Sequence, residues 1–140
     1  MKIPALLIFL AFISARPSQA QDRLIVIVDG LKNDKGSVMV GLFDEKADYL
    51  KKASIGKVVS IKANSATVIF DDLAPGTYAL SIIHDENGNG ELDTNVIGIP
   101  IEGFGFGNNA MGLFGPPSFK NASITLQGAP MTQRLKMRYF

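Results

Sequence analysis

Apolar and polar residues alternate with a period of two along most of the chain after residue 20, and no long stretch has the 3.6-residue period of a helix. Such alternation is typical of β-strands that turn one face toward a core. Seven short strands with turn signals between them predict an all-β domain, a single antiparallel β-sandwich. The expected strands cover residues 23–29, 37–43, 57–63, 66–70, 77–84, 122–127 and 135–139, and one short helix is expected within 44–53.

One connection is too long for an ordinary loop. Residues 93–119 exceed the roughly 12 to 15 residues beyond which an unstructured loop is uncommon in a compact domain. Within it, the Gly/Phe segment (residues 103–119) alternates glycines with four phenylalanines. We expect this segment to be ordered and to lie over one end of the sandwich, beside the acidic loop described below. Two interpretations stay open for its four aromatic rings: they fill the core, or they form an exposed ligand-binding platform. The residues concerned are Phe104, Phe106, Phe114 and Phe119.

The first twenty residues have the features of a secretory signal peptide. Lys2 precedes an apolar run over residues 3–13, and Ser18 and Ala20 are the small residues of a cleavage site. The run is shorter than the roughly 20 residues that cross a bilayer. We therefore expect a signal peptide at 1–20, a β-sandwich domain at 21–140, a periplasmic or secreted location and no membrane span after cleavage.

Charge and cysteine content narrow the function classes. Without Lys2 and Arg16, the chain has 12 basic and 13 acidic residues, and a net charge of −1. The basic residues are scattered, so the sequence lacks the positive patch that nucleic-acid binding requires. The chain contains no cysteine, which excludes disulfides and cysteine chemistry. A metal ion would be a reasonable substitute as a structural staple.

The most informative stretch is the acidic loop, residues 84–93, with the sequence HDENGNGELD. When Asp85 is counted as position 1, oxygen-bearing residues fall at positions 3, 5, 7 and 9 and a glycine falls at 6, as in the first part of an EF-hand calcium loop. A ligand set made only of oxygen favours calcium over zinc or copper. The predicted metal ligands are Asp85, Asn87, Asn89, Glu91, Asp93 and, from further along the chain, Glu102.

The calcium pattern is incomplete, and two other interpretations stay open. Position 12 is Val96 instead of the bidentate glutamate of an EF-hand, so Glu102 or water must complete the shell. Asn, Asp and Gly also dominate tight turns, so the loop can be a bare hairpin turn. Alternatively, carboxylates near Glu91 and Glu102 can act as the acid and base of a small hydrolase acting on a glycan-type substrate. Glu86, at an even position, is expected to point outward into solvent.

His84 is the only histidine of the chain, so any catalytic dyad would have to use it. It can orient Asp85 as a partner of the ion site, although a strand-end histidine bound to backbone is the more common situation. No serine lies in a G-x-S-x-G context, and the GFGFG sequence lacks the spacing of a phosphate-binding loop. Acyl-transfer catalysis and nucleotide binding are therefore not expected.

Several motifs in the mature chain resemble one bacterial family of uncharacterised exported proteins, domain-of-unknown-function family 2141. The resemblance implies an exported sandwich of prealbumin-like or immunoglobulin-like type, with no established activity. The motifs that carry it are PGTY at 75–78, HDENGNG at 84–90, GIP at 98–100, EG at 102–103 and FGPPSF at 114–119.

Together these observations predict an exported, non-catalytic binding or accessory module. We expect calcium in the acidic loop and a partner that is an envelope or extracellular protein or a glycan. The small hydrolase remains the alternative.

Overall fold

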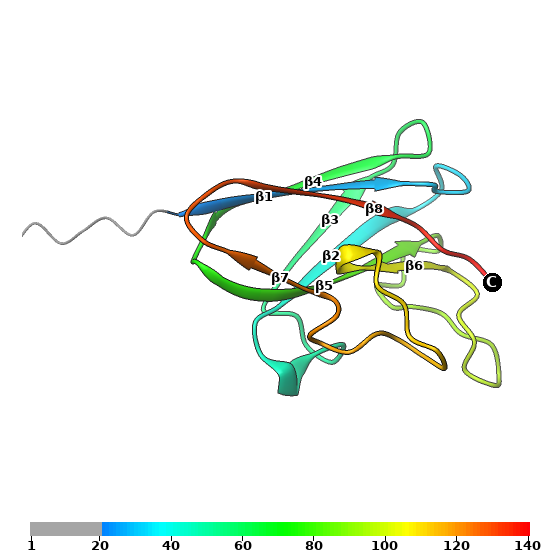
Figure 1. Ribbon diagram of the computed structural model, residues 1–140. Coiled ribbons are helices and arrows are strands. Elements are labelled where there is room, and N and C mark those ends of the chain that lie inside the picture. Colours follow the sequence, from blue (N-terminus) through cyan, green and yellow to red (C-terminus); the bar gives the residue numbers. More distant parts are fainter. Residues whose placement is uncertain (1–20) are drawn as a thin grey trace, which may run out of the picture.

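The computed structural model of the protein describes residues 21–140, and the predicted signal peptide lies outside the described residues. Two β-sheets pack face to face (Figure 1). The three-stranded sheet has the order β4-β1-β8; the five-stranded sheet has the order β3-β2-β5-β6, with β7 also paired to β5. The elements are β1 (Asp22–Asp29), β2 (Ser37–Phe43), η1 (Lys46–Asp48), β3 (Ile55–Ser60), β4 (Ala66–Leu73), β5 (Gly76–Asp85), β6 (Gly103–Phe106), η2 (Gly107–Asn109), β7 (Ser123–Leu126) and β8 (Met131–Lys136). The predicted all-β sandwich is confirmed.

Some elements differ from the prediction. β6 lies inside the long connection, where no strand was predicted, and it forms because β5 offers an unpaired edge to which the GFGF sequence adds. β8 pairs with β1 in parallel, so one pair departs from the predicted antiparallel arrangement. The expected helix at 44–53 shortens to the three-residue 3-10 helix η1. β3 and β8 each begin before their predicted starts, because cross-strand pairing and not local alternation sets their ends.

The main core lies between the two sheets. Alternate residues of β1, β2, β4 and β5 point inward and are removed from solvent, as period-2 alternation requires. On the five-stranded sheet these inward residues are Val38, Val40, Leu42, Leu80 and Ile82.

Two strands, β6 and β7, pair with the edge of β5 that faces away from β2. Residues 76–79 pair with β7, and residues 81–84 pair with β6. The chain between β6 and β7, residues 107–122, leaves the sheet and returns to the same edge. This excursion carries most of the Gly/Phe segment.

A second, smaller cluster lies on the outer face of the five-stranded sheet. Its buried members come from β2, β5, β6 and the residue before β7, and half-buried aromatic rings from η1's loop and the Gly/Phe segment pack against it. Tyr49 connects these layers by edge-to-face contacts with Phe43 and Phe119. The outer face is therefore covered in part, and the rest forms the groove described next.

Candidate functional site

The acidic loop is held by hydrogen bonds to the buried carboxylate of Asp85. Its Oδ1 accepts the backbone N–H of Gly88 at 2.9 Å and of Asn89 at 3.2 Å, and its Oδ2 accepts that of Gly90 at 2.8 Å. Gly90 has a φ of +78°, a conformation that favours glycine. The loop thus wraps around its first carboxylate, as a cation-binding loop with a glycine at position 6 does.

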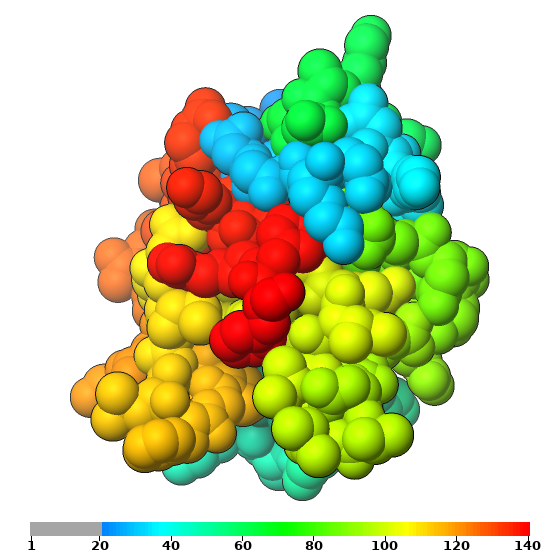
Figure 2. Space-filling view, turned by 90° about the vertical axis from the view of Figure 1, so that its right-hand side faces the viewer, coloured from blue at the N-terminus to red at the C-terminus, as the bar shows by residue number. Residues whose placement is uncertain are grey.

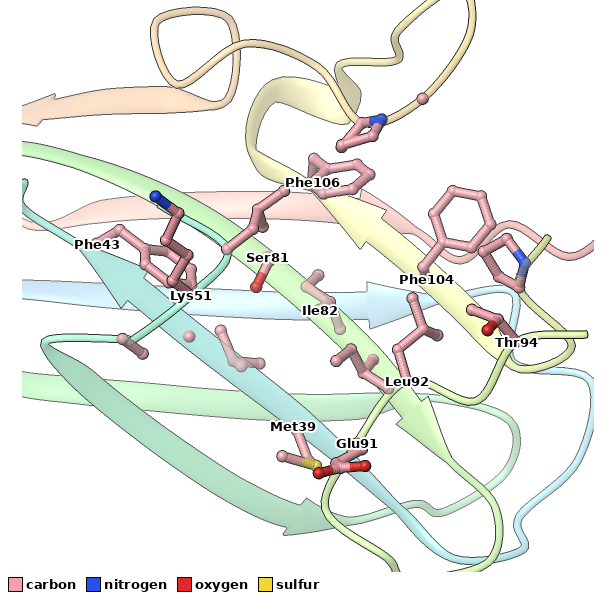
Figure 3. Close-up of a pocket in the computed structure, with 18 of the residues that line it drawn as sticks. Met39, Phe43, Lys51, Ser81, Ile82, Glu91, Leu92, Thr94, Phe104 and Phe106 are labelled. Carbon is pink, nitrogen blue, oxygen red and sulfur yellow. The ribbon is translucent and has the colours of Figure 1, made fainter. Parts of the chain in front are cut away.

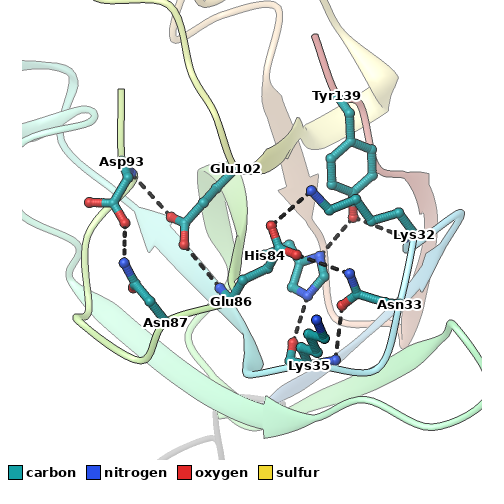
Figure 4. Close-up of polar contacts among 9 residues, drawn as sticks. All are labelled: Lys32, Asn33, Lys35, His84, Glu86, Asn87, Asp93, Glu102 and Tyr139. Carbon is teal, nitrogen blue, oxygen red and sulfur yellow. Dashed lines mark hydrogen bonds and ion pairs between the residues drawn. The ribbon is translucent and has the colours of Figure 1, made fainter. Parts of the chain in front are cut away.

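Three more predicted ligands converge on one another. The side-chain amides of Asn87 and Asn89 donate to the two carboxylate oxygens of Asp93, at 2.5 and 2.7 Å (the first is drawn in Figure 4). Glu91 is exposed and contributes its backbone N–H to Asn89 Oδ1 at 3.0 Å. Positions 3, 5 and 9 therefore face a common point. Within residues 21–140, however, no three His, Cys, Asp or Glu side chains form a group that could hold a metal ion.

Glu102 closes the base of the loop. Its side chain is 4% exposed, and its two oxygens accept the backbone N–H of Glu86 at 3.0 Å and of Asp93 at 3.1 Å (Figure 4). A single carboxylate thus joins the start and the end of the loop. Each oxygen keeps a further lone pair, so this role leaves its predicted place in a calcium shell open.

His84 is buried and bonded to two groups, and neither is Asp85 (Figure 4). Nε2 lies 2.7 Å from the carbonyl oxygen of Lys35, and Nδ1 lies 2.7 Å from the hydroxyl of Tyr139. A carbonyl only accepts, so Nε2 carries a proton and donates to Lys35, while Nδ1 shares its hydrogen bond with the Tyr139 hydroxyl. The interpretation of His84 as a strand-end histidine bound to backbone is supported by this geometry.

Glu86 turns away from the loop, but it does not extend freely into solvent as predicted. It accepts a hydrogen bond from Asn33 at 3.0 Å and forms a 2.9 Å ion pair with Lys32. The hydrogen bond from Asn33 and the nearby Lys32 ammonium lower the pKa of Glu86. Lys32 also lies over the ring of Tyr139, so this network ties the loop to the C-terminal strand region.

Beside the acidic loop, the outer face of the five-stranded sheet forms an apolar groove with a cavity volume of about 950 Å³. Its floor is set by strand register. Gly56 pairs with Gly41, Gly41 with Ser81, and Ser81 with Phe106, so one row across four strands has three small members. The neighbouring row is large throughout: Val58, Met39, Ile83 and Phe104. The row of small side chains leaves a trough beside a wall of large ones.

Loops form the sides of this groove. Residues 90–100 rise on one side, residues 111–116 on another, and residues 50–53 after η1 complete the enclosure. In Figure 2, the first two appear as separate lobes below the C-terminal residues, with the η1 region visible at the base between them. The acidic loop therefore builds one wall of the groove through Glu91 and Leu92.

Few polar groups reach the groove. Ser81 projects from the floor, whereas Lys51 lies beside Phe43 at one end and Glu91 and Thr94 lie toward the other (Figure 3). Lys57 also borders it, but its ammonium donates to the carbonyl oxygen of Ile69 and lies over the ring of Phe70. The groove is thus an apolar cavity with two hydroxyl groups, those of Ser81 and Thr94, and with opposite charges on its two sides.

The four phenylalanines of the Gly/Phe segment separate into two kinds. Phe104 and Phe106 are buried and Phe119 packs against their cluster, as expected for plugs, although the first two also line the groove. Phe114 is 103% exposed at the groove's border, so its interpretation as a plug is wrong. It lies on the excursion, where no neighbouring strand covers it.

Tyr49 anchors the excursion over the groove. Its hydroxyl donates to the carbonyl oxygen of Pro117 at 3.0 Å, and burial raises its pKa to about 12. Sequence reasoning missed this residue, along with Gly41, Gly56, Ser81 and Lys51. The only available signal was the presence of small residues inside otherwise apolar strands, which also marks bulges and close backbone approach.

Comparison with known proteins adds the family. No curated protein and no solved structure matches the chain. In the described residues 21–140, no helix is long and apolar enough to cross a membrane. The family model described as "Uncharacterized protein conserved in bacteria (DUF2141)" matches residues 26–134, most of the β-sandwich, and the chain therefore belongs to this bacterial family.

Proposed function

We propose that this protein is a non-catalytic binding module whose ligand is a small apolar molecule held in the groove. The observation that carries the proposal is the row of small side chains, Gly56, Gly41 and Ser81, under an open cavity of about 950 Å³. Ligand sites in proteins have volumes of roughly 300 to 1,000 Å³ and combine apolar walls with a few polar groups. A sheet face intended only for burial would be filled by side chains instead.

We further propose that calcium binds the acidic loop and stiffens one wall of the groove. The convergence of Asn87, Asn89 and Asp93 supports this, together with the turn of the backbone around Asp85. To present their oxygens to a cation, the two amides would have to rotate and release the backbone N–H groups of Asn89 and Glu91 that these oxygens accept in this structure. The ion would then stabilise the loop without taking part in chemistry.

The features of residues 1–20 support export, so the module would act in the periplasm or outside the cell. A hydrolase receives less support from the same residues. Glu102 is buried and accepts two backbone N–H groups, while Glu91 lies exposed on the groove wall. A carboxylate used in this way is a structural element of the loop.

The groove can be tested with an uncharged fluorescent probe, N-phenyl-1-naphthylamine, whose emission rises in apolar sites. We expect saturable binding to the wild-type protein and loss of binding in Gly56→Leu. A Cβ at Gly56 would meet only the carbonyl oxygen of Val40, at 3.9 Å, so a leucine should fill the trough without disturbing the core.

The matched control is Ser60→Leu, which adds the same side chain to an exposed position of β3 that does not line the groove. It should bind the probe as wild type does. Absence of saturable binding to the wild-type protein, or equal binding by Gly56→Leu, would contradict the proposed site.

Calcium is tested separately by thermal unfolding in chelator and in millimolar calcium. At 100 times the dissociation constant, a bound ion adds about 2.7 kcal/mol of stability. Asp93→Ala should abolish the rise in Tm, and Glu86→Ala should keep it. An unchanged Tm in the wild-type protein would exclude the ion.

A further inference from the structure

We propose that the groove selects an apolar molecule that carries one carboxylate, with the carboxylate at the Lys51 end. This inference rests on the proposed binding function and specifies the ligand class. Three features carry it: the shape of the trough, the single available ammonium and the placement of Glu91.

The dimensions of the trough fit an elongated, narrow ligand. Neighbouring strands lie about 4.8 Å apart, so the row from Gly56 through Gly41 to Ser81 spans about 10 Å across the sheet before Phe106 closes it. Residues of adjacent rows on one face are about 7 Å apart along a strand, so the trough is about one side-chain row wide. An alkyl chain or a single ring fits this space, whereas a folded peptide does not.

Lys51 supplies the positive charge. Among the described residues that line the groove there are two lysines, and the ammonium of Lys57 is already bonded to the carbonyl oxygen of Ile69. Lys51 is exposed, has no ion pair within residues 21–140, and lies beside Phe43 at the groove (Figure 3). An anionic group bound there would be the only partner of this ammonium.

Glu91 and Ser81 determine the orientation of the ligand in the groove. Lys51 and Glu91 lie on opposite sides of the row of small residues, Lys51 beside Phe43 and Glu91 toward Met39, so the Glu91 carboxylate would repel an anion on its own side (Figure 3). Ser81, on the row of small residues, offers a hydroxyl that projects from the groove floor (Figure 3). An acid would therefore enter with its head group at Lys51 and its apolar body over the small-residue row.

The test is competition against N-phenyl-1-naphthylamine by three ligands with the same alkyl chain: dodecanoate, dodecanol and dodecylamine. We expect dodecanoate to compete about three- to fivefold better than dodecanol, the size of effect that an exposed charge pair contributes. Dodecylamine would bind in the reverse orientation, with its ammonium at Glu91, so Glu91→Gln should weaken its competition and leave that of dodecanoate unchanged. Lys51→Gln should remove the preference for the acid, and Lys52→Gln, which changes the adjacent exposed lysine, should keep it.

The outcomes separate this inference from the proposed function. Equal competition by the acid and the alcohol, or a preference that survives in Lys51→Gln, would overturn the ligand class while leaving an apolar binding site. A wild-type protein that binds neither the probe nor any of the three ligands would overturn both proposals.

Discussion

The two faces of the five-stranded sheet are made by the same strands, but side chains pack differently on each face. The inner face presents branched aliphatic side chains that interlock with the three-stranded sheet and exclude water. The outer face is also apolar, yet its row of small residues borders an open cavity under loops, which Ala53 and the Phe43 ring narrow at Gly41. Burial of apolar area drives folding on both faces, so hydrophobicity does not distinguish them. Side-chain volume does: large alternating residues make a core, and small ones in register make a cavity.

The strongest test of this difference compares two positions of β2. Leu42→Ala removes a fully buried side chain from the inner face and should lower the free energy of unfolding by about 2 to 5 kcal/mol. Met39→Ala, on the outer face beside the groove, should cost less than about 1 kcal/mol, because the side chain is only half-buried. Urea unfolding monitored by circular dichroism measures both. Similar losses would mean that the outer face is as tightly packed as the core.

The second test compares two phenylalanines of the Gly/Phe segment. Phe106→Ala should destabilise the protein by about 3 kcal/mol, the low end for a buried aromatic ring, because one side of the ring faces the groove. Phe114→Ala should change the unfolding free energy by less than about 0.5 kcal/mol, because that ring is fully exposed. A large loss for Phe114→Ala would show that the excursion packs over the groove more closely than in this structure.

These contrasts indicate what local sequence can predict. The SVMVGLF stretch predicts β2 at its observed bounds, because polar residues precede and follow a clear apolar run. The acidic loop is also predictable, since Asp85 and its hydrogen-bond partners lie within six residues of one another. β6 cannot be predicted from local sequence, because GFGF has the glycine content of a loop and becomes a strand only beside β5.

The groove is the clearest example of information that the linear pattern lacks. Gly41, Gly56 and Ser81 are unremarkable along the chain, and they form one row only through the register of three strands. The parallel pairing of β8 with β1 has the same origin, because strand direction depends on where the chain crosses between sheets. Alternation specifies which face a residue takes, but not which residue of a distant strand lies beside it.

A third test concerns the wall next to the acidic loop. Glu102→Ala should leave the N–H groups of Glu86 and Asp93 without their acceptor and cost about 1 to 3 kcal/mol. Amide hydrogen exchange should accelerate at these two positions before it changes in β2. Glu91→Ala, which removes an exposed carboxylate of the same wall, should leave both exchange rates unchanged. Unaltered exchange in Glu102→Ala would show that the Glu102 carboxylate does not hold the start and the end of the acidic loop together.

The smallest effect is expected at the opposite wall and at alkaline pH. Burial raises the pKa of Tyr49 to about 12 from a normal value of 10.0, so the folded protein holds this proton more tightly than the unfolded chain. The corresponding stability is complete below about pH 10 and is lost as the pH rises through 12. Tm measured from pH 9 to 12 should therefore fall, and less steeply in Tyr49→Phe.

Tyr78 and Tyr139, whose pKa values are also raised by burial, remain in the Tyr49→Phe variant. Some alkaline loss should therefore persist. An identical slope in the wild-type protein and in Tyr49→Phe would mean that burial does not raise the pKa of the Tyr49 hydroxyl.

Because β6 and β7 pair with the same edge of β5, the groove wall formed by residues 111–116 lies in an insertion between two strand segments. β6 and β7 run in the same direction along that edge, so they are two pieces of one interrupted strand, and residues 108–122 are the insertion between them. A chain that joined Gly107 directly to Ser123 would place Ser123 opposite Ala79 with no break in register, as it is now. Insertions of other lengths and compositions could be grafted at this point without altering the order of strands. One sandwich could in this way support cavities of different shape, with ligand choice residing in an insertion that leaves the strand register unchanged.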